Sequence, residues 1–126
     1  GMGSSLLLAA LLGEDADRIG PEAKRRHTEH YADLADLQRP FPGARELVRA
    51  VADRGARAVL ATSAGPDELE RLLAVLDVED ALTGITSDKD VEEAKPDPDL
   101  VLTALEVAGV AADRAVLVGD TVWDVQ

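Results

Sequence analysis

Cysteine is absent from this sequence of 126 residues, and aromatic residues are nearly absent. Without cysteine the chain forms no disulfides and no thiolate metal sites, which fits a reducing cytoplasm. Aromatic rings occur only at Tyr31, Phe41 and Trp123, so the core has to be built from Ala, Val and Leu. The longest apolar run, residues 6–12, is too short to span a bilayer. We therefore expect a cytoplasmic protein with no membrane partner.

Basic residues are also scarce, with 13 Lys and Arg against 25 Asp and Glu and a formal net charge of −12. Nucleic acid is therefore not expected as a partner, because a phosphate backbone needs clustered basic side chains. A small phosphorylated substrate remains compatible with this charge, because one lysine and a bound cation can reverse the field inside a pocket. The hydrophobic content of 46% is that of a globular protein, with the length of one domain or of one domain and part of another.

The first part of the chain, residues 1–39, is predicted to be helical. Ser4 or Ser5 can cap a short apolar helix. A polar turn is expected at 13–20, and Pro21 stands at a plausible first position of a second helix.

The second part, residues 40–126, follows two prolines and a glycine within 38–43 and alternates helices with strands. Helices are expected to begin at Ala44, at Pro66 and at Asp97 or Pro98, and strands are expected at 58–62, 82–86 and 115–118. Strands that are apolar throughout, alternating with helices, imply a parallel sheet covered on both faces. The predicted fold class is therefore α/β.

Polar side chains follow the predicted strands at the edge where open parallel sheets bind ligands. Thr62, Asp88 and Asp120 lie at or just past the carboxyl ends of the three strands. We expect them to converge in space in spite of their separation in the sequence.

Asp120 and Asp124 stand where the last predicted strand turns into a helix. Both carboxylates can reach one cation, directly or through water, and Mg²⁺ suits them because it prefers few carboxylates together with waters and substrate phosphate. A helix cap at Asp120 followed by a solvated acid explains the pattern equally well, so the spacing alone leaves both interpretations open.

Thr62 and Ser63 precede a predicted helix, where a hydroxyl and backbone N–H groups can hold phosphate oxygens. An ordinary helix cap is the alternative for both residues. Lys95 lies in the stiff segment 95–98, KPDP, where an ammonium group could offset phosphoryl charge. A surface lysine in a proline-rich loop is the alternative for Lys95.

In this order, the segments VLATSA, AKPDPD and VLVGDTVWD resemble the second, third and fourth motifs of haloacid dehalogenase superfamily hydrolases. The similarity is to the phosphoglycolate phosphatase and β-phosphoglucomutase-like branch. PFPGARELV resembles the return from the helical cap of that family into its core, and GMGSSLLLAALLG resembles the start of the cap. The resemblance implies a partial helical cap at 1–39 and a Rossmann-like parallel sheet core at 40–126.

The resemblance also implies a Mg²⁺-dependent phosphatase of small phosphorylated metabolites that works through an aspartyl-phosphate intermediate. Thr62, with Ser63, would bind phosphate, and Lys95 would stabilise the transferring group. Asp120 would coordinate Mg²⁺, supported by Asp124. A phosphomutase of the same family, or a non-catalytic receiver-like or degenerate phosphate-binding module, is the alternative.

The first motif of the family, a strand that ends in Asp-x-Asp, has no counterpart in the sequence. Asp15 and Asp17 have the right spacing, but no apolar strand leads into them. The missing strand is normally the central one of the sheet, between the strands that end at Thr62 and Gly119. We therefore expect this chain to be a fragment with an incomplete core, without the nucleophile and without phosphatase turnover of its own. The sequence predicts neither a particular substrate nor an oligomeric state.

Overall fold

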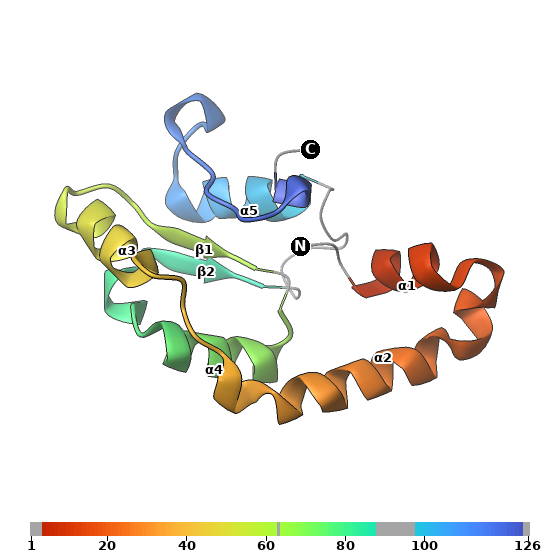
Figure 1. The fold of residues 1–126 in the computed structure, drawn as a ribbon. Coiled ribbons are helices and arrows are strands. Elements are labelled where there is room, and N and C mark those ends of the chain that lie inside the picture. Colours follow the sequence, from red (N-terminus) through yellow and green to blue (C-terminus); the bar gives the residue numbers. More distant parts are fainter. Residues whose placement is uncertain (1–3, 63, 88–97, 125–126) are drawn as a thin grey trace.

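The computed structural model describes residues 4–62, 64–87 and 98–124 (Figure 1). Its main elements, in chain order, are α1 (Ser4–Leu12), α2 (Ala16–Asp33), α3 (Ala44–Asp53), β1 (Val59–Ala61), α4 (Pro66–Leu76), β2 (Gly84–Thr86) and α5 (Asp99–Ala108). Single 3₁₀ turns lie at Gly13–Asp15, Ala35–Leu37, Glu79–Ala81, Ala112–Arg114 and Val122–Asp124. None of the helices in the described ranges is long and apolar enough to cross a membrane.

Pro21 does not begin the second helix as predicted, because α2 already starts at Ala16 and contains Pro21 in its interior. The predicted polar turn at 13–20 is correspondingly reduced to the 3₁₀ turn Gly13–Asp15. An interior proline leaves the carbonyl four residues earlier, here that of Asp17, without its helical donor. Ion pairs between neighbouring turns of α2, such as Arg25 Nη2 to Glu22 Oε1 at 2.7 Å, favour the helix in spite of this loss.

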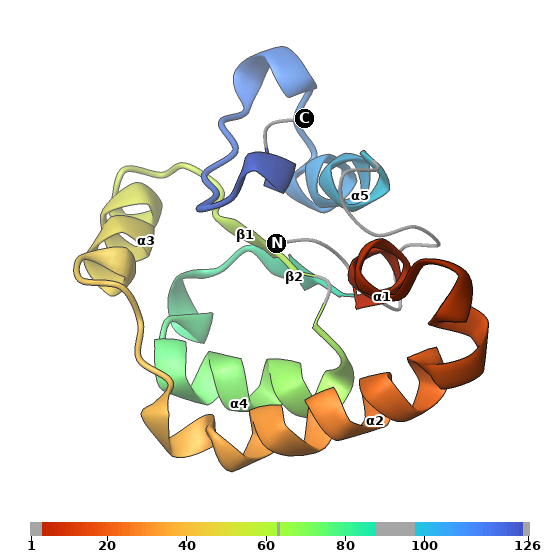
Figure 2. The same cartoon turned by 45° about the vertical axis from the view of Figure 1, so that its right-hand side comes forward.

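The helices of the first part lie apart from the strands. Figures 1 and 2 show α1 folded back along α2, which extends away from the sheet, and the two helices contact each other. Gly20 is the buried residue of α2. The division of the chain after residue 39 into two units stays a prediction.

Two arginines of α3 fix the position of α4. The side chain of Arg45 donates to the carbonyl oxygens of Leu76 at 2.8 Å and Val75 at 2.6 Å. Arg49 donates to the carbonyl of Asp77 at 2.9 Å and pairs with the carboxylate of Asp80 at 3.1 Å. The last carbonyls of a helix lack helical partners and carry its negative end, so cationic donors there satisfy both needs.

The sheet of the described residues has two parallel strands, β1 and β2, as predicted for 58–62 and 82–86. The ladder continues past both ends, because Thr62 N–H donates to Thr86 O at 3.2 Å and Thr83 N–H donates to Ala58 O at 2.7 Å. The paired residues are Val59 with Gly84, Leu60 with Ile85 and Ala61 with Thr86. This small sheet with its helices agrees with the predicted incomplete Rossmann-like α/β core.

Helix α5 covers one side of the two strands, whereas α4 lies on the other side (Figure 1). Gly84 makes the contact with α5 possible, because a Cβ at this position would lie 2.4 Å from Val107 Cγ1. Arg57, just before β1, donates to the carbonyl of Ala108 at the end of α5. Leu100 of α5 is only 1% exposed, and Val78, between α4 and β2 in the sequence, is fully buried.

The prediction of a third strand at 115–118 is wrong, because this segment belongs to no sheet of the described residues. Val116 is 89% exposed and Val118 is 72% exposed. A strand is stable only when its backbone N–H and C=O groups find a neighbour, and in the described part of the chain β1 and β2 pair only with each other. The apolar composition typical of a buried strand therefore faces solvent here.

Candidate functional site

Thr62 lies at the carboxyl end of β1 and has a fixed side chain. Its Oγ1 accepts a hydrogen bond from the Ala64 backbone N–H at 3.1 Å, while its own N–H continues the sheet to Thr86. A hydroxyl that accepts through its oxygen can still donate its proton. Thr62 therefore presents one O–H donor at the edge where a phosphate oxygen is expected.

The start of α4 follows this residue closely. Pro66 occupies the first turn, and no side chain among the described residues caps the helix. Open N–H groups at a helix start attract anions, but Asp67 and Glu68 in the same turn already supply negative charge. A phosphate at this edge therefore needs positive charge from elsewhere.

Three of the residues singled out from the sequence, Ser63, Asp88 and Lys95, lie outside the described residues. Their roles stay predictions from the resemblance.

Thr86, at the carboxyl end of β2, is a feature that sequence reasoning missed. It is 1% exposed, and its Oγ1 has no hydrogen-bond partner within the described ranges. A buried hydroxyl costs about 1–3 kcal/mol where it is left without a partner. The available signal was a threonine at the end of the second strand, beside the one at the end of the first.

Asp120 and Asp124 belong to one tight turn, which follows Gly119. Asp120 is exposed, whereas Asp124 is half-buried in the 3₁₀ turn Val122–Asp124. The Asp124 Oδ2 accepts hydrogen bonds from the backbone N–H of Thr121 at 3.0 Å and from its hydroxyl at 2.7 Å. The turn is closed by the Asp124 N–H, which donates to Thr121 O at 3.1 Å.

A side chain at position 119 would collide with Asp124, so only glycine fits at this position. A Cβ on Gly119 would lie 2.5 Å from both Cβ and Cγ of Asp124 and 2.7 Å from its Oδ2. The Asp124 carboxylate thus folds back over Gly119, the residue that precedes Asp120. This glycine is required by the packing of an acid rather than by a left-handed backbone.

The donor set of this turn fits Mg²⁺. The ion keeps several waters and is commonly held by one or two carboxylates together with substrate phosphate. No cluster of three or more acidic or histidine ligands exists in the described part of the chain, so water and substrate would have to complete the coordination. Two carboxylates, one orientated and one exposed to solvent, match this requirement.

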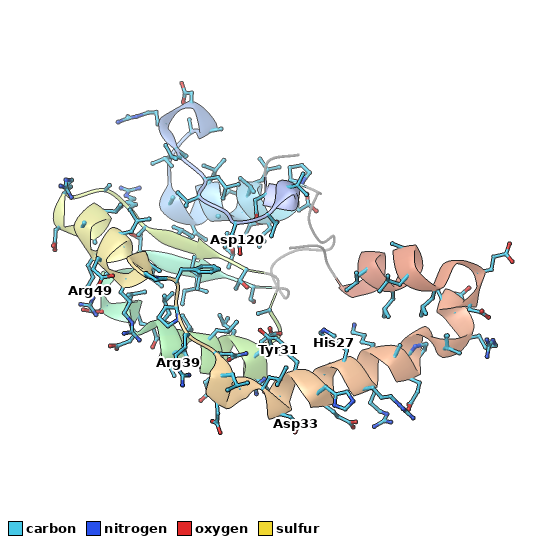
Figure 3. All side chains as sticks on the ribbon, in the orientation of Figure 1. His27, Tyr31, Asp33, Arg39, Arg49 and Asp120 are labelled. Atoms are coloured by element: carbon cyan, nitrogen blue, oxygen red, sulfur yellow. The ribbon has the colours of Figure 1, made fainter. Side chains whose placement is uncertain are left out.

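The turn 119–124 lies near the sheet. Figure 3 shows Asp120 between α5 and β1, and Figure 2 shows its segment beside β1 from another direction. Among the described residues no hydrogen bond links Thr62 to the turn 119–124. Asp120 and Asp124 thus belong to one turn, and Thr62 follows the nearby strand β1.

Comparison with known proteins gives consistent matches. The sequence profile of the haloacid dehalogenase-like hydrolases matches residues 1–126. Phosphoglycolate phosphatase of Rhodospirillum rubrum is 32% identical over 99% of this chain and 56% of its own length. The phosphorylated carbohydrates phosphatase of Thermotoga maritima is 30% identical over 94% of this chain and 54% of its own length.

A solved structure is also similar. The crystal structure of a hydrolase from Pseudomonas syringae superimposes with a TM-score of 0.86 and 30% identity, over 98% of this chain and 58% of that one. The chain therefore spans about half the length of the curated relatives it matches.

Proposed function

Because this chain belongs to the haloacid dehalogenase-like hydrolases, we propose that the whole protein is a Mg²⁺-dependent phosphatase of small phosphorylated metabolites. Two relatives are named for phosphatase activity on phosphoglycolate and on phosphorylated carbohydrates, which supports the substrate class. The observation that carries the metal is the turn in which Gly119 leaves room for the Asp124 carboxylate beside Asp120.

Within this proposal, each described residue has one task. Asp120 and Asp124 hold the cation, and Thr62 donates its hydroxyl proton to a phosphate oxygen. Bound Mg²⁺ supplies charge neutralisation and orientation of the phosphoryl group. By the family resemblance, Ser63 adds a phosphate contact and Lys95 adds a second positive charge.

The cation matters more here than in a neutral protein. The chain carries a formal net charge of −12, and Asp67 and Glu68 stand in the first turn of the helix after Thr62. A doubly charged phosphate ester is repelled by this field unless local positive charge outweighs it. We therefore expect the requirement for a divalent cation to be strict.

The aspartyl-phosphate route needs an aspartate at the end of a strand. Both described strands are instead followed by hydroxyl residues, Thr62 after β1 and Ser87 after β2. By the family resemblance, the nucleophile and the acid/base belong to a strand that ends in Asp-x-Asp, and neither is among the residues assigned a task in this proposal.

The test is phosphate release by the whole protein from a panel of phosphate esters, with phosphoglycolate and sugar phosphates included. We expect turnover in Mg²⁺ and none in a chelator. Asp120→Asn should reduce turnover by roughly 100-fold or more, the scale of losing one electrostatic contact to a transition state. Asp113→Asn, which removes the same charge from an exposed 3₁₀ turn, is the matched control and should retain activity. If Asp120→Asn kept full activity at the same Mg²⁺ concentration as the wild type, the metal assignment would be refuted.

A phosphate-binding module without turnover is the second candidate. The observation in its favour is that both described strands end beside hydroxyls, Thr62 and Thr86, which can bind phosphate oxygens. Such a module would bind orthophosphate in a calorimetric titration and release none from any ester of the panel.

A further inference from the structure

The carboxylate of Asp124 is held by both polar donors of a single residue. The backbone N–H and the side-chain hydroxyl of Thr121 reach the same oxygen, Oδ2, at 3.0 Å and 2.7 Å. A hydroxyl bond of this length to an ionised acceptor is of the strong, charge-assisted kind. Thr121 is only partly exposed, so water competes little for these contacts.

Gly119 lies against another side of this carboxylate and leaves the space that Asp124 fills. The Asp124 Cβ, Cγ and Oδ2 all pack within 2.7 Å of the place where a Cβ on Gly119 would stand. The side chain of Asp124 is therefore held between a backbone surface on one side and two donors on the other. Its orientation is set before any ligand arrives.

This arrangement limits how Asp124 can meet a cation. A carboxylate that chelates with both oxygens has to present Oδ2, and this oxygen already accepts two hydrogen bonds. Asp124 is thus restricted to one oxygen or to a bridging water. Mg²⁺ tolerates such contacts well, because it favours octahedral geometry and keeps part of its hydration shell.

We propose that Thr121 is a positioning residue that orients Asp124 toward the cation and limits it to a one-oxygen or water-mediated contact. This inference rests on the proposed function, because it assumes a cation at Asp120 and Asp124. The competing explanation is that Thr121 and Asp124 merely close the 3₁₀ turn Val122–Asp124. The two explanations differ in whether metal affinity or only stability depends on the hydroxyl.

The experiment measures Mn²⁺ binding to the whole protein through the electron paramagnetic resonance signal of the free ion. Thr121→Val removes the hydroxyl and keeps the shape and the backbone N–H. We expect its affinity to fall by about tenfold, since loss of a partner that orients a metal ligand typically costs 10- to 100-fold. Thr121→Ser retains the hydroxyl, so its Mn²⁺ affinity should remain within about threefold of that of the wild type. Thr28→Val, which removes a threonine hydroxyl from the exposed surface of α2, should leave binding unchanged.

Thermal melting of the metal-free variants separates the two explanations. The proposal is overturned if Thr121→Val binds Mn²⁺ like the wild type, or if Thr121→Ser loses as much affinity as Thr121→Val. It is also overturned if the metal-free Thr121→Val protein melts early and its affinity falls only in proportion to the unfolded fraction. Asp120→Asn distinguishes the two levels of the argument. If both Asp120→Asn and Thr121→Val bind Mn²⁺ normally, the proposed metal site itself fails. If Asp120→Asn loses binding while Thr121→Val keeps it, only the role of Thr121 is refuted.

Discussion

Gly84→Ala tests whether the contact between α5 and the sheet is as close as the structure has it. The new Cβ would lie 2.4 Å from Val107 Cγ1, whereas ordinary contacts begin at 3.4 Å, so the two groups must separate by about 1 Å. Val107 is β-branched and stiff in a helix, which leaves displacement of α5 as the main way to relieve the clash. Overpacking of this kind costs about 1–3 kcal/mol, and we expect about 2 kcal/mol here because Val107 is 43% exposed and can yield in part.

The assay is equilibrium urea unfolding of the whole protein, followed by circular dichroism. Val107→Ala should cost less than about 1 kcal/mol by itself, because the side chain is only partly buried. The double variant should then recover most of the loss, with a coupling energy of about 1–2 kcal/mol between the two sites.

Gly20→Ala is the matched control for this prediction. Its Cβ would meet nothing within 4 Å, so the same substitution inside α2 should stabilise by about 0.5–1 kcal/mol. The reasoning fails if Gly84→Ala unfolds at the wild-type urea concentration, or if Val107→Ala and Gly84→Ala add without coupling. Either result would mean that α5 does not rest on β2 through this glycine.

Two further outcomes are expected. The hydrogen bond from Arg25, followed by that from Arg26, lowers the pKa of Glu22 from 4.5 to about 2. The helical signal of α2 should therefore persist above pH 4.5 and decline as the pH falls toward about 2. Glu22→Gln should remove this pH-dependent part in acid titrations followed by circular dichroism, and an unchanged titration would contradict the contact. Arg45→Met should lower stability by about 1–2 kcal/mol in urea unfolding, because the final carbonyls of α4 lose their charged donor; a wild-type midpoint would show that water replaces the arginine fully.

Much of the local structure follows from local chemistry. Pro66 with two acids behind it predicts the start of α4, and the structure begins that helix at the same residue. The helix predicted from Ala44 ends as expected just before Gly55, which takes a positive φ of 74°. Such signals act within one or two turns of the chain, so no distant contact is needed to interpret them.

Other positions could not be predicted because their environment is made by distant segments. Pro21 has the character of a helix start, yet contacts and ion pairs along α2 place it inside the helix. Residues 115–118 have the composition of a buried strand, yet Val116 is 89% exposed because no partner strand lies beside it in the described ranges. Composition states what a segment is suited for, whereas its neighbours determine what it forms.

The same distinction applies to the candidate site. Residue types and their order were sufficient to name Thr62, Asp120 and Asp124 and to predict phosphate and cation chemistry, because hydroxyl and carboxylate groups keep their ligand preferences in any fold. Spacing could not reveal that Asp124 lies over Gly119 and takes both donors of Thr121. Nor could it reveal that the Thr86 hydroxyl is buried without a partner among the described residues. Those facts depend on the direction of each side chain after the backbone has turned and packed, and packing is a property of the folded chain.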